Sequence, residues 1–207
     1  KSREGKYSTF KTFYNLKKDT RDRSFNVKNG NLFSFGQSFA TPLSDVPYIS
    51  NNIRNSFYSE LSENYVINLK TGFSSINGLD NKDIKLSDRK FISTRNLRGF
   101  ESLGVGPVDN NNHIGGNYTA YASIASTFPN PLPDKWNAKS LMFFDAGNVW
   151  GVDFDKSKDS DEIRSSVGLG LDWISPLGPI SFSLSNVLSK ANTDKEQSFS
   201  FLLGSVF

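Results

Sequence analysis

The chain has 207 residues, 36% of them hydrophobic, and 24 basic and 21 acidic residues give it a formal net charge of +3. It contains no cysteine and a single histidine, which excludes thiolate metal sites, disulfides and cysteine nucleophiles within this chain. The basic residues are scattered among the acids instead of forming a patch, so no nucleic-acid partner is expected.

Nine segments show the alternation of apolar and polar residues that is typical of β-strands. In the segment 65–74, for example, the odd positions are tyrosine, isoleucine, leucine, threonine and phenylalanine, and the even positions are mostly polar. The 18 phenylalanines and seven tyrosines suit such strands, because aromatic side chains pack well on a pleated surface. The predicted strands lie near residues 6–16, 31–41, 52–62, 65–74, 116–128, 138–150, 164–174, 179–188 and 197–207.

Two all-β folds, a soluble β-sandwich and a transmembrane β-barrel, share this alternation. A barrel strand crosses a membrane with about 9–11 residues, every second one apolar, so a mean hydropathy of −0.44 is compatible with a barrel. Connection lengths favour the barrel, in which short turns lie on one side of the membrane and long loops on the other. Tight connections at 62–64 and 175–179 alternate with longer ones at 75–115, 151–163 and 189–196, although those at 17–30 and 129–137 exceed ideal turns.

Aromatic residues near the ends of the predicted strands fit either fold. They are expected in the girdle where a barrel meets the membrane interface, and equally in the core of a sandwich. Together with the connection lengths they favour the girdle. These residues are Tyr65, Phe73, Trp150, Trp173 and Phe207.

The polar segment 75–115 is too long for an unstructured connection in a compact domain, and it contains the sequence Leu97-Arg98-Gly99-Phe100. One interpretation of Arg98 is a solvated loop arginine. In the other, the loop folds back into the barrel lumen, where Gly99 permits a tight backbone path and Phe100 packs against the wall.

An inward-facing guanidinium requires a carboxylate, because an unpaired desolvated charge is costly. Asp145 is the best candidate partner for Arg98, since it is the only acid in the segment 138–150 and lies between apolar neighbours. Alternation places it on the face that is inner in a barrel. Arg164 and Asp172, on the next predicted strand, are further candidates for the same network.

The sequence offers little support for an enzyme. His113 is the only histidine, and no serine lies in a recognisable nucleophile elbow. The glycine pairs Gly104/Gly106 and Gly168/Gly170 lack the full dinucleotide-binding fingerprint and are interpreted as structural. We therefore expect no catalytic residues, no metal site and no cofactor.

Several motifs together resemble one known family. Residues 97–100 resemble its lumenal-loop signature, 115–117 the exit of that loop, and 19–30 a turn before a strand. Residues 143–150 and 164–179 resemble its later strands. The chain is thus similar to the C-terminal barrel half of the BamA family of outer-membrane β-barrel assembly proteins. Their bacterial surface antigen superfamily also holds TamA, the mitochondrial sorting-and-assembly barrel and the two-partner secretion transporters.

The resemblance implies an antiparallel transmembrane β-barrel in the outer membrane of a Gram-negative bacterium. Residues 1–207 would be its C-terminal part, preceded by further strands and periplasmic POTRA domains. In the family, the loop arginine contacts lumenal acids, including the aspartate that matches Asp145. A glutamate that is common in the family is replaced here by Ala125, so Arg98 is expected to depend more heavily on Asp145.

The function implied by the resemblance is non-enzymatic folding and insertion of β-barrel proteins. The implied partners are nascent outer-membrane proteins, the lipoproteins of an assembly complex and outer-membrane lipid. The last strand, with Phe199, Phe201 and Phe207, would form one side of the barrel seam, where client strands are templated. A polypeptide-secreting transporter of the same superfamily, of two-partner or TamA-like type, is the alternative, and a porin-like channel is a third class.

Overall fold

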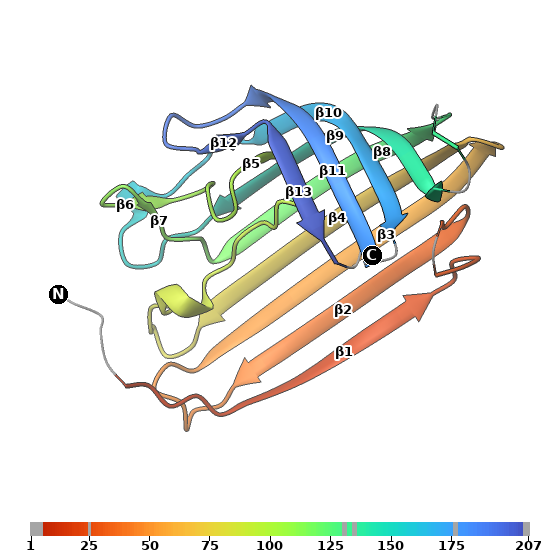
Figure 1. The fold of residues 1–207 in the computed structure, drawn as a ribbon. Coiled ribbons are helices and arrows are strands. Elements are labelled where there is room, and N and C mark those ends of the chain that lie inside the picture. Colours follow the sequence, from red (N-terminus) through yellow and green to blue (C-terminus); the bar gives the residue numbers. More distant parts are fainter. Residues whose placement is uncertain (1–5, 25, 130–131, 134–135, 176–177, 205–207) are drawn as a thin grey trace.

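The structure is a computed structural model that describes residues 6–24, 26–129, 132–133, 136–175 and 178–204. Its main feature is one antiparallel sheet of nine strands, each paired with its neighbours along the chain (Figure 1). The predicted all-β antiparallel fold and its nine strands are confirmed. The strands are β1 (Lys11–Asp19), β2 (Gly30–Ala40), β3 (Tyr48–Ser62), β4 (Tyr65–Gly78), β8 (Tyr118–Phe128), β9 (Ala138–Trp150), β10 (Arg164–Ser175), β11 (Gly178–Ser189) and β13 (Phe199–Leu203).

Several strand boundaries differ from the prediction; β4, for example, extends to Gly78, four residues beyond its predicted end. The first strand begins at Lys11 and not near residue 6, and β3 begins at Tyr48, four residues before the predicted start. The earlier start of β3 follows from pairing, because Tyr48 lies opposite Ala40 and Gly78 in its two neighbours. Among the described residues, β1 and β13 each pair with one strand only, so the sheet is not closed.

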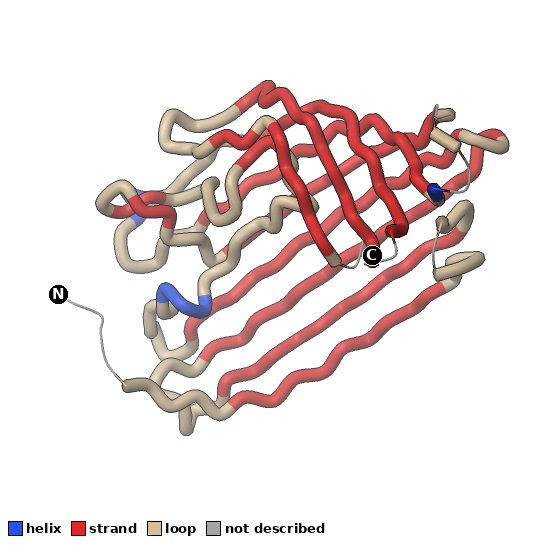
Figure 2. The backbone as a smooth tube through the Cα atoms, viewed as in Figure 1, coloured by secondary structure: helices blue, strands red, loops and turns tan. Residues whose placement is uncertain are grey.

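The longer connections gather at one end of the sheet, the end with β5, β6 and β7 in Figure 1. They contain the short strands β5 (Gly99–Phe100), β6 (Val108–Asp109), β7 (Asn112–His113) and β12 (Glu196–Gln197), and two short 3₁₀ helices (Figure 2). The helices are η1 (Leu86–Asp88) and η3 (Lys156–Lys158). In the part of the chain that the structure describes, no helix is long and apolar enough to cross a membrane.

The sheet has two chemically different faces, which we call inner and outer. The inner face carries Asp145 and the folded-back loop, and the outer face is its opposite. Along β9, Leu141, Phe143 and Asp145 are buried on the inner face, whereas Met142 and Phe144 on the outer face are 51% and 42% exposed. Large apolar side chains thus remain exposed on the outer face of several strands, as expected where a barrel meets lipid.

The segment between β4 and β8 packs against the inner face. Ile92, Leu97, Phe100 and Val105 form a buried cluster with Val149 of β9. This contact explains why a long polar segment is ordered, since it buries its few apolar residues against the wall. A second cluster lies nearer the end with the long connections and joins Ala40, Tyr48, Ile76 and Ile84.

Candidate functional site

A polar row crosses the inner face at the level of Asp145. Antiparallel register places Lys70 of β4 opposite Ser123 of β8, Ser123 opposite Asp145 of β9, and Asp145 opposite Ser166 of β10. Directly opposed residues share a face, so these four side chains form one line of neighbours. Asp145 and Ser166 are completely buried, which identifies this row as the floor of the site.

Arg98 lies on this row and forms a bidentate ion pair with Asp145. Its Nε and Nη2 atoms donate to the two carboxylate oxygens, each at 2.7 Å, and its backbone N–H donates to Oδ2 at 3.0 Å. The Arg98 side chain is 15% exposed and that of Asp145 is 0% exposed. Removing one partner of such a buried pair costs about 3–5 kcal/mol, because the other charge is left uncompensated.

Further contacts complete the environment of the Arg98 tip. Its Nη2 atom donates to the Ser123 hydroxyl at 3.2 Å, and its guanidinium lies 3.4 Å from the centre of the Phe143 ring. The Ser166 hydroxyl donates to the Arg98 carbonyl oxygen at 2.5 Å. With Ala125 in place of the family's glutamate, Arg98 is expected to depend more heavily on Asp145. Ser123 also contributes, because its hydroxyl oxygen accepts a hydrogen bond from the guanidinium.

Gly99 and Phe100 fix the path of the chain after Arg98. Gly99 has φ of +92°, and a Cβ atom there would lie 3.1 Å from the Ser166 Cβ and 3.2 Å from a Val187 methyl group. Gly99 and Phe100 form β5, which pairs with β12 just before the last strand of the sheet. Phe100 and Leu97 are each 2% exposed, so all four residues of the motif are fixed against the wall.

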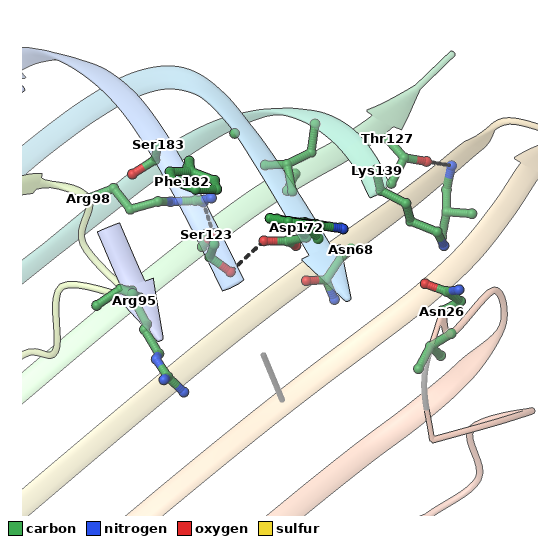
Figure 3. A pocket seen from close by; sticks show the side chains of 18 of the residues that line it. Asn26, Asn68, Arg95, Arg98, Ser123, Thr127, Lys139, Asp172, Phe182 and Ser183 are labelled. Carbon is green, nitrogen blue, oxygen red and sulfur yellow. Dashed lines mark hydrogen bonds between the residues drawn. The ribbon is translucent and has the colours of Figure 1, made fainter. Parts of the chain in front are cut away.

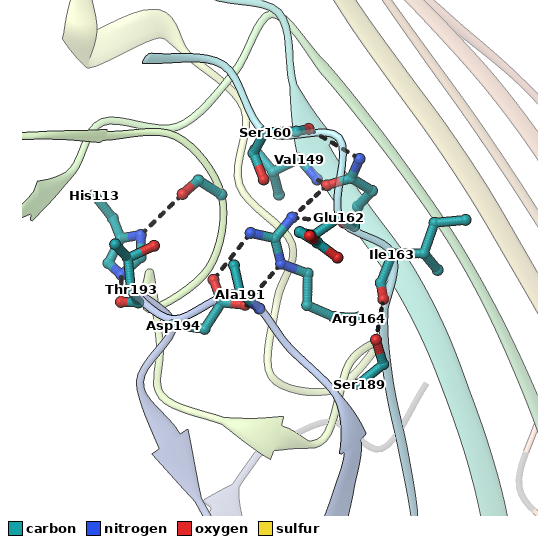
Figure 4. A network of polar contacts seen from close by, with 12 residues as sticks. His113, Val149, Ser160, Glu162, Ile163, Arg164, Ser189, Ala191, Thr193 and Asp194 are labelled. Atoms are coloured by element: carbon teal, nitrogen blue, oxygen red, sulfur yellow. Dashed lines mark hydrogen bonds and ion pairs between the residues drawn. The ribbon is translucent and has the colours of Figure 1, made fainter. Parts of the chain in front are cut away.

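Arg164 does not join the Arg98 network, and this prediction was wrong. Its Nε and Nη2 atoms donate to the carboxylate of Asp194 at 2.8 and 3.0 Å, and both side chains are 0% exposed (Figure 4). Its Nη1 atom donates to the Asn148 side chain and to the Glu162 carbonyl. Arg164 lies two residues along β10 from Ser166, so it reaches the turn before β12 instead of the Arg98 tip.

Asp172 also lies apart from the ion pair. Its carboxylate accepts a hydrogen bond from the Ser181 hydroxyl at 2.6 Å, and among the described residues it has no ion pair or hydrogen bond with Arg98. Both side chains line the same cavity of about 190 Å³ on the inner face (Figure 3). Of the predicted network, the structure therefore shows the buried Arg98–Asp145 ion pair, with the Asp172 carboxylate nearby but not bonded to Arg98.

The predicted seam strand presents its aromatic residues on the outer face. Phe199 and Phe201 of β13 are 53% and 51% exposed. Phe201 lies opposite Phe182 of β11, with their ring centres 5.3 Å apart. Phe207 lies outside the described residues.

A second ion pair, which no pattern in the sequence indicates, organises the same loop. Arg89, whose side chain is completely buried, pairs with Asp153 in the connection after β9. The other oxygen of Asp153 accepts from the Ile84 N–H at 2.6 Å and from the Asn117 side chain at 3.2 Å. No group of three or more possible metal ligands occurs within the described ranges, and the chemistry of the site is that of ion pairing.

Comparison with known proteins identifies the family. The Omp85 superfamily domain matches residues 1–207. The chain belongs to the Omp85 superfamily. Within it, the chain is 30% identical over 199 residues to the outer membrane protein assembly factor BamA of Neorickettsia risticii, which covers 94% of this chain and 27% of that protein. It is 28% identical to BamA of Neisseria meningitidis, over 86% of this chain and 26% of the relative.

The folds also agree. The crystal structure of BamA from Haemophilus ducreyi lacking POTRA domains 1–3 matches with a TM-score of 0.86 and 26% identity, over 93% of this chain and 41% of that one. The chain thus spans about a quarter of the length of the curated Omp85 relatives. The fold is that of the C-terminal half of a BamA barrel, as the motifs around Arg98 and Asp145 indicate.

Proposed function

We propose that this chain is the C-terminal part of an outer-membrane assembly factor that folds and inserts β-barrel proteins. The observation that carries the proposal is the docking of Arg98 on Asp145 inside a sheet similar to the BamA barrel. Three similar relatives are named outer membrane protein assembly factor BamA. This agreement favours assembly over polypeptide secretion, the alternative from the sequence.

The physical basis of the activity is strand addition at an open edge. A strand in a bilayer has no water to satisfy its backbone N–H and C=O groups, so an unpaired edge favours pairing with an incoming strand. We place this edge at β13, which has one partner among the described strands. The client's own hydrogen bonding and apolar burial supply the free energy, and neither nucleotide nor catalytic residue is needed.

The Arg98 loop serves as an internal brace in this proposal. It is tied to β9 by Asp145, to β10 by Ser166, and to the turn before β13 through β5 and β12. These contacts hold the inner wall next to β13 in place, while the free backbone edge of β13 is available to a client strand. The brace therefore connects the Arg98 motif to assembly without any chemistry at Arg98 itself.

The remaining parts of the proposal concern the whole protein. Further strands complete the barrel, and POTRA domains precede it. The barrel lies in the outer membrane of a Gram-negative bacterium and works with assembly-complex lipoproteins. Its clients are nascent outer-membrane β-barrel proteins.

Reconstitution tests the function directly. The full-length protein is placed in liposomes, a urea-unfolded client barrel is added, and the folded fraction is followed by heat-modifiable migration. We expect faster client folding than in empty liposomes, without nucleotide. An unchanged folding rate, combined with transfer of a soluble polypeptide across the membrane, would instead identify a secretion transporter.

A further inference from the structure

We propose that the inner face carries a binding site for an oxyanion, a carboxylate or a phosphate group, next to the Arg98–Asp145 pair. The site is the cavity of about 190 Å³ lined by the inner face and by the segment that bears Arg98 (Figure 3). A cavity needs only about 10–15 Å³ of this kind of volume to hold one water molecule, so this one is large enough for one such group and part of its hydration shell. The proposal goes beyond the assembly function and does not require it.

The lining of the cavity has an excess of positive charge. Among the described residues, Lys70, Arg95, Arg98 and Lys139 are the cations that line it, and Asp172 is the one carboxylate. Asp145 lies beneath and neutralises Arg98 by binding its Nε and Nη2 atoms. Even when Arg95 is left aside, the three cations Lys70, Arg98 and Lys139 outnumber the two carboxylates among the described residues, which favours an anion in the cavity.

Lys70 is the cation next to the ion pair in the polar row. Its opposite neighbours in the sheet are Ser56 and Ser123, neither of which carries charge. The Ser123 hydroxyl already accepts from Arg98, and both Asp145 oxygens are engaged by Arg98. The Lys70 ammonium therefore has no ion pair or hydrogen bond among the described residues, although the side chain is only partly exposed.

Lys139 is in a similar position at another part of the cavity (Figure 3). Asp172 lies opposite it in the register of β9 and β10, but the Asp172 carboxylate accepts a hydrogen bond from Ser181. No carboxylate of the described residues lies within ion-pair distance of the Lys139 ammonium. Two partly exposed lysines in one cavity thus lack a counter-ion in the part of the chain that the structure describes.

An oxyanion would supply both the negative charge and the hydrogen-bond acceptors that the Lys70 and Lys139 ammonium groups need. Partly buried charges are costly unless they are paired and hydrogen-bonded. A lysine ammonium binds carboxylate or phosphate as a point charge with three donors, and a nearby guanidinium adds oriented N–H groups. The group has two chemical sources, a free inorganic anion and the acidic side chain of a polypeptide that enters the lumen.

Calorimetric titration of the full-length protein in detergent micelles tests the site and separates these sources. One arm uses inorganic phosphate, and the other uses a blocked Gly-Glu-Gly peptide with Gly-Gln-Gly as its neutral control. We expect saturable binding in at least one arm that weakens with added salt. Binding of phosphate alone identifies a free-anion site, and binding of the glutamate peptide identifies a polypeptide carboxylate. Saturation in neither arm overturns the proposal.

Substitutions then locate the binding. Lys70→Gln and Lys139→Gln are each expected to lower the affinity for the anion at least tenfold, which corresponds to about 1.4 kcal/mol of binding free energy. Lys156→Gln removes the same charge from the connection after β9, outside the cavity, and is expected to leave binding unchanged. Lys70→Arg keeps the charge and is expected to retain binding, which separates charge from folding defects. Equal affinity in Lys70→Gln, Lys139→Gln and the unsubstituted protein would overturn the site.

Discussion

The Ser166 hydroxyl of β10 donates a hydrogen bond to the carbonyl oxygen of Arg98, while the Arg98 side chain and N–H group are bound by Asp145 of β9. The wall of the sheet therefore binds the backbone of the loop tip on both sides of Arg98, in addition to its guanidinium. A loop held in this way is a fixed part of the lumen. Contacts to two adjacent strands also make its position sensitive to their register.

The buried ion pair is expected to dominate the stability of the loop. In the full-length protein, Asp145→Asn keeps the shape of the side chain but leaves the Arg98 charge uncompensated, so we expect a loss of about 3–5 kcal/mol. Urea unfolding in detergent, followed by tryptophan fluorescence, measures it. The matched control is Asp22→Asn, which removes the charge that pairs with the exposed Arg23 but keeps an amide oxygen for the N–H groups of Lys28 and Asn29, and it should cost about 1 kcal/mol or less. Equal effects of the two substitutions would contradict the account.

Gly99 provides a test of close packing at the tip. Gly99→Ala adds a Cβ atom at φ of +92° and at 3.1–3.2 Å from Ser166 and Val187. Gly178→Ala is the matched control, because Gly178 has φ of +115° and no atom of the described residues lies within 4 Å of an added Cβ atom. We expect about 1–2 kcal/mol of backbone strain in both variants, and a larger loss for Gly99→Ala, measured by urea unfolding. A Gly99→Ala variant no less stable than Gly178→Ala would show that the tip is not packed.

Arg164 is expected to hold the turn before the last strand. In the full-length protein, Asp194→Asn leaves the completely buried Arg164 guanidinium without its ion-pair partner, so the turn at 190–195 should open more often. Limited trypsin digestion detects this opening as faster cleavage after Lys190 or Lys195. Asp159→Asn in the connection after β9 serves as the control. Unchanged cleavage after Lys190 and Lys195 in Asp194→Asn would exclude this role of Arg164.

Two neighbouring residues of β8 test which face meets lipid. Ile124 is 48% exposed on the outer face, and Ala125 faces the cavity that Arg98 lines. We expect Ile124→Glu to destabilise the membrane-inserted protein by on the order of 2 kcal/mol. Ala125→Glu should be tolerated, because a carboxylate there approaches the basic lining. The reverse order of stability in lipid vesicles would assign the faces the other way round.

The sequence predicts the strands well because alternation is a local property that each strand carries by itself. It also points to Asp145, which is conspicuous as the one acid in a strand of apolar neighbours. The contributions of Ser123 and Ser166 depend on strand register, which turns and bulges set and which side-chain periodicity does not reveal. Asp194 lies in a polar turn among other polar residues, so nothing in the pattern marks it as the partner of Arg164.

A reversible cross-link tests most directly whether the loop stays docked during assembly. An ideal Cβ atom at Gly104 lies 3.1 Å from the Lys195 Cβ atom, slightly closer than the usual 3.5–4.5 Å or so of a disulfide, and 3.0 Å from the Glu101 Cβ atom, so Glu101 must shift slightly to admit it. This chain has no cysteine. The full-length Gly104→Cys/Lys195→Cys protein, with any cysteine elsewhere replaced by serine, is compared oxidised and reduced in the liposome folding assay. The account predicts that the disulfide forms and that client folding proceeds at the same rate in both states. Folding activity that is lost on oxidation and restored by reduction would contradict a fixed brace.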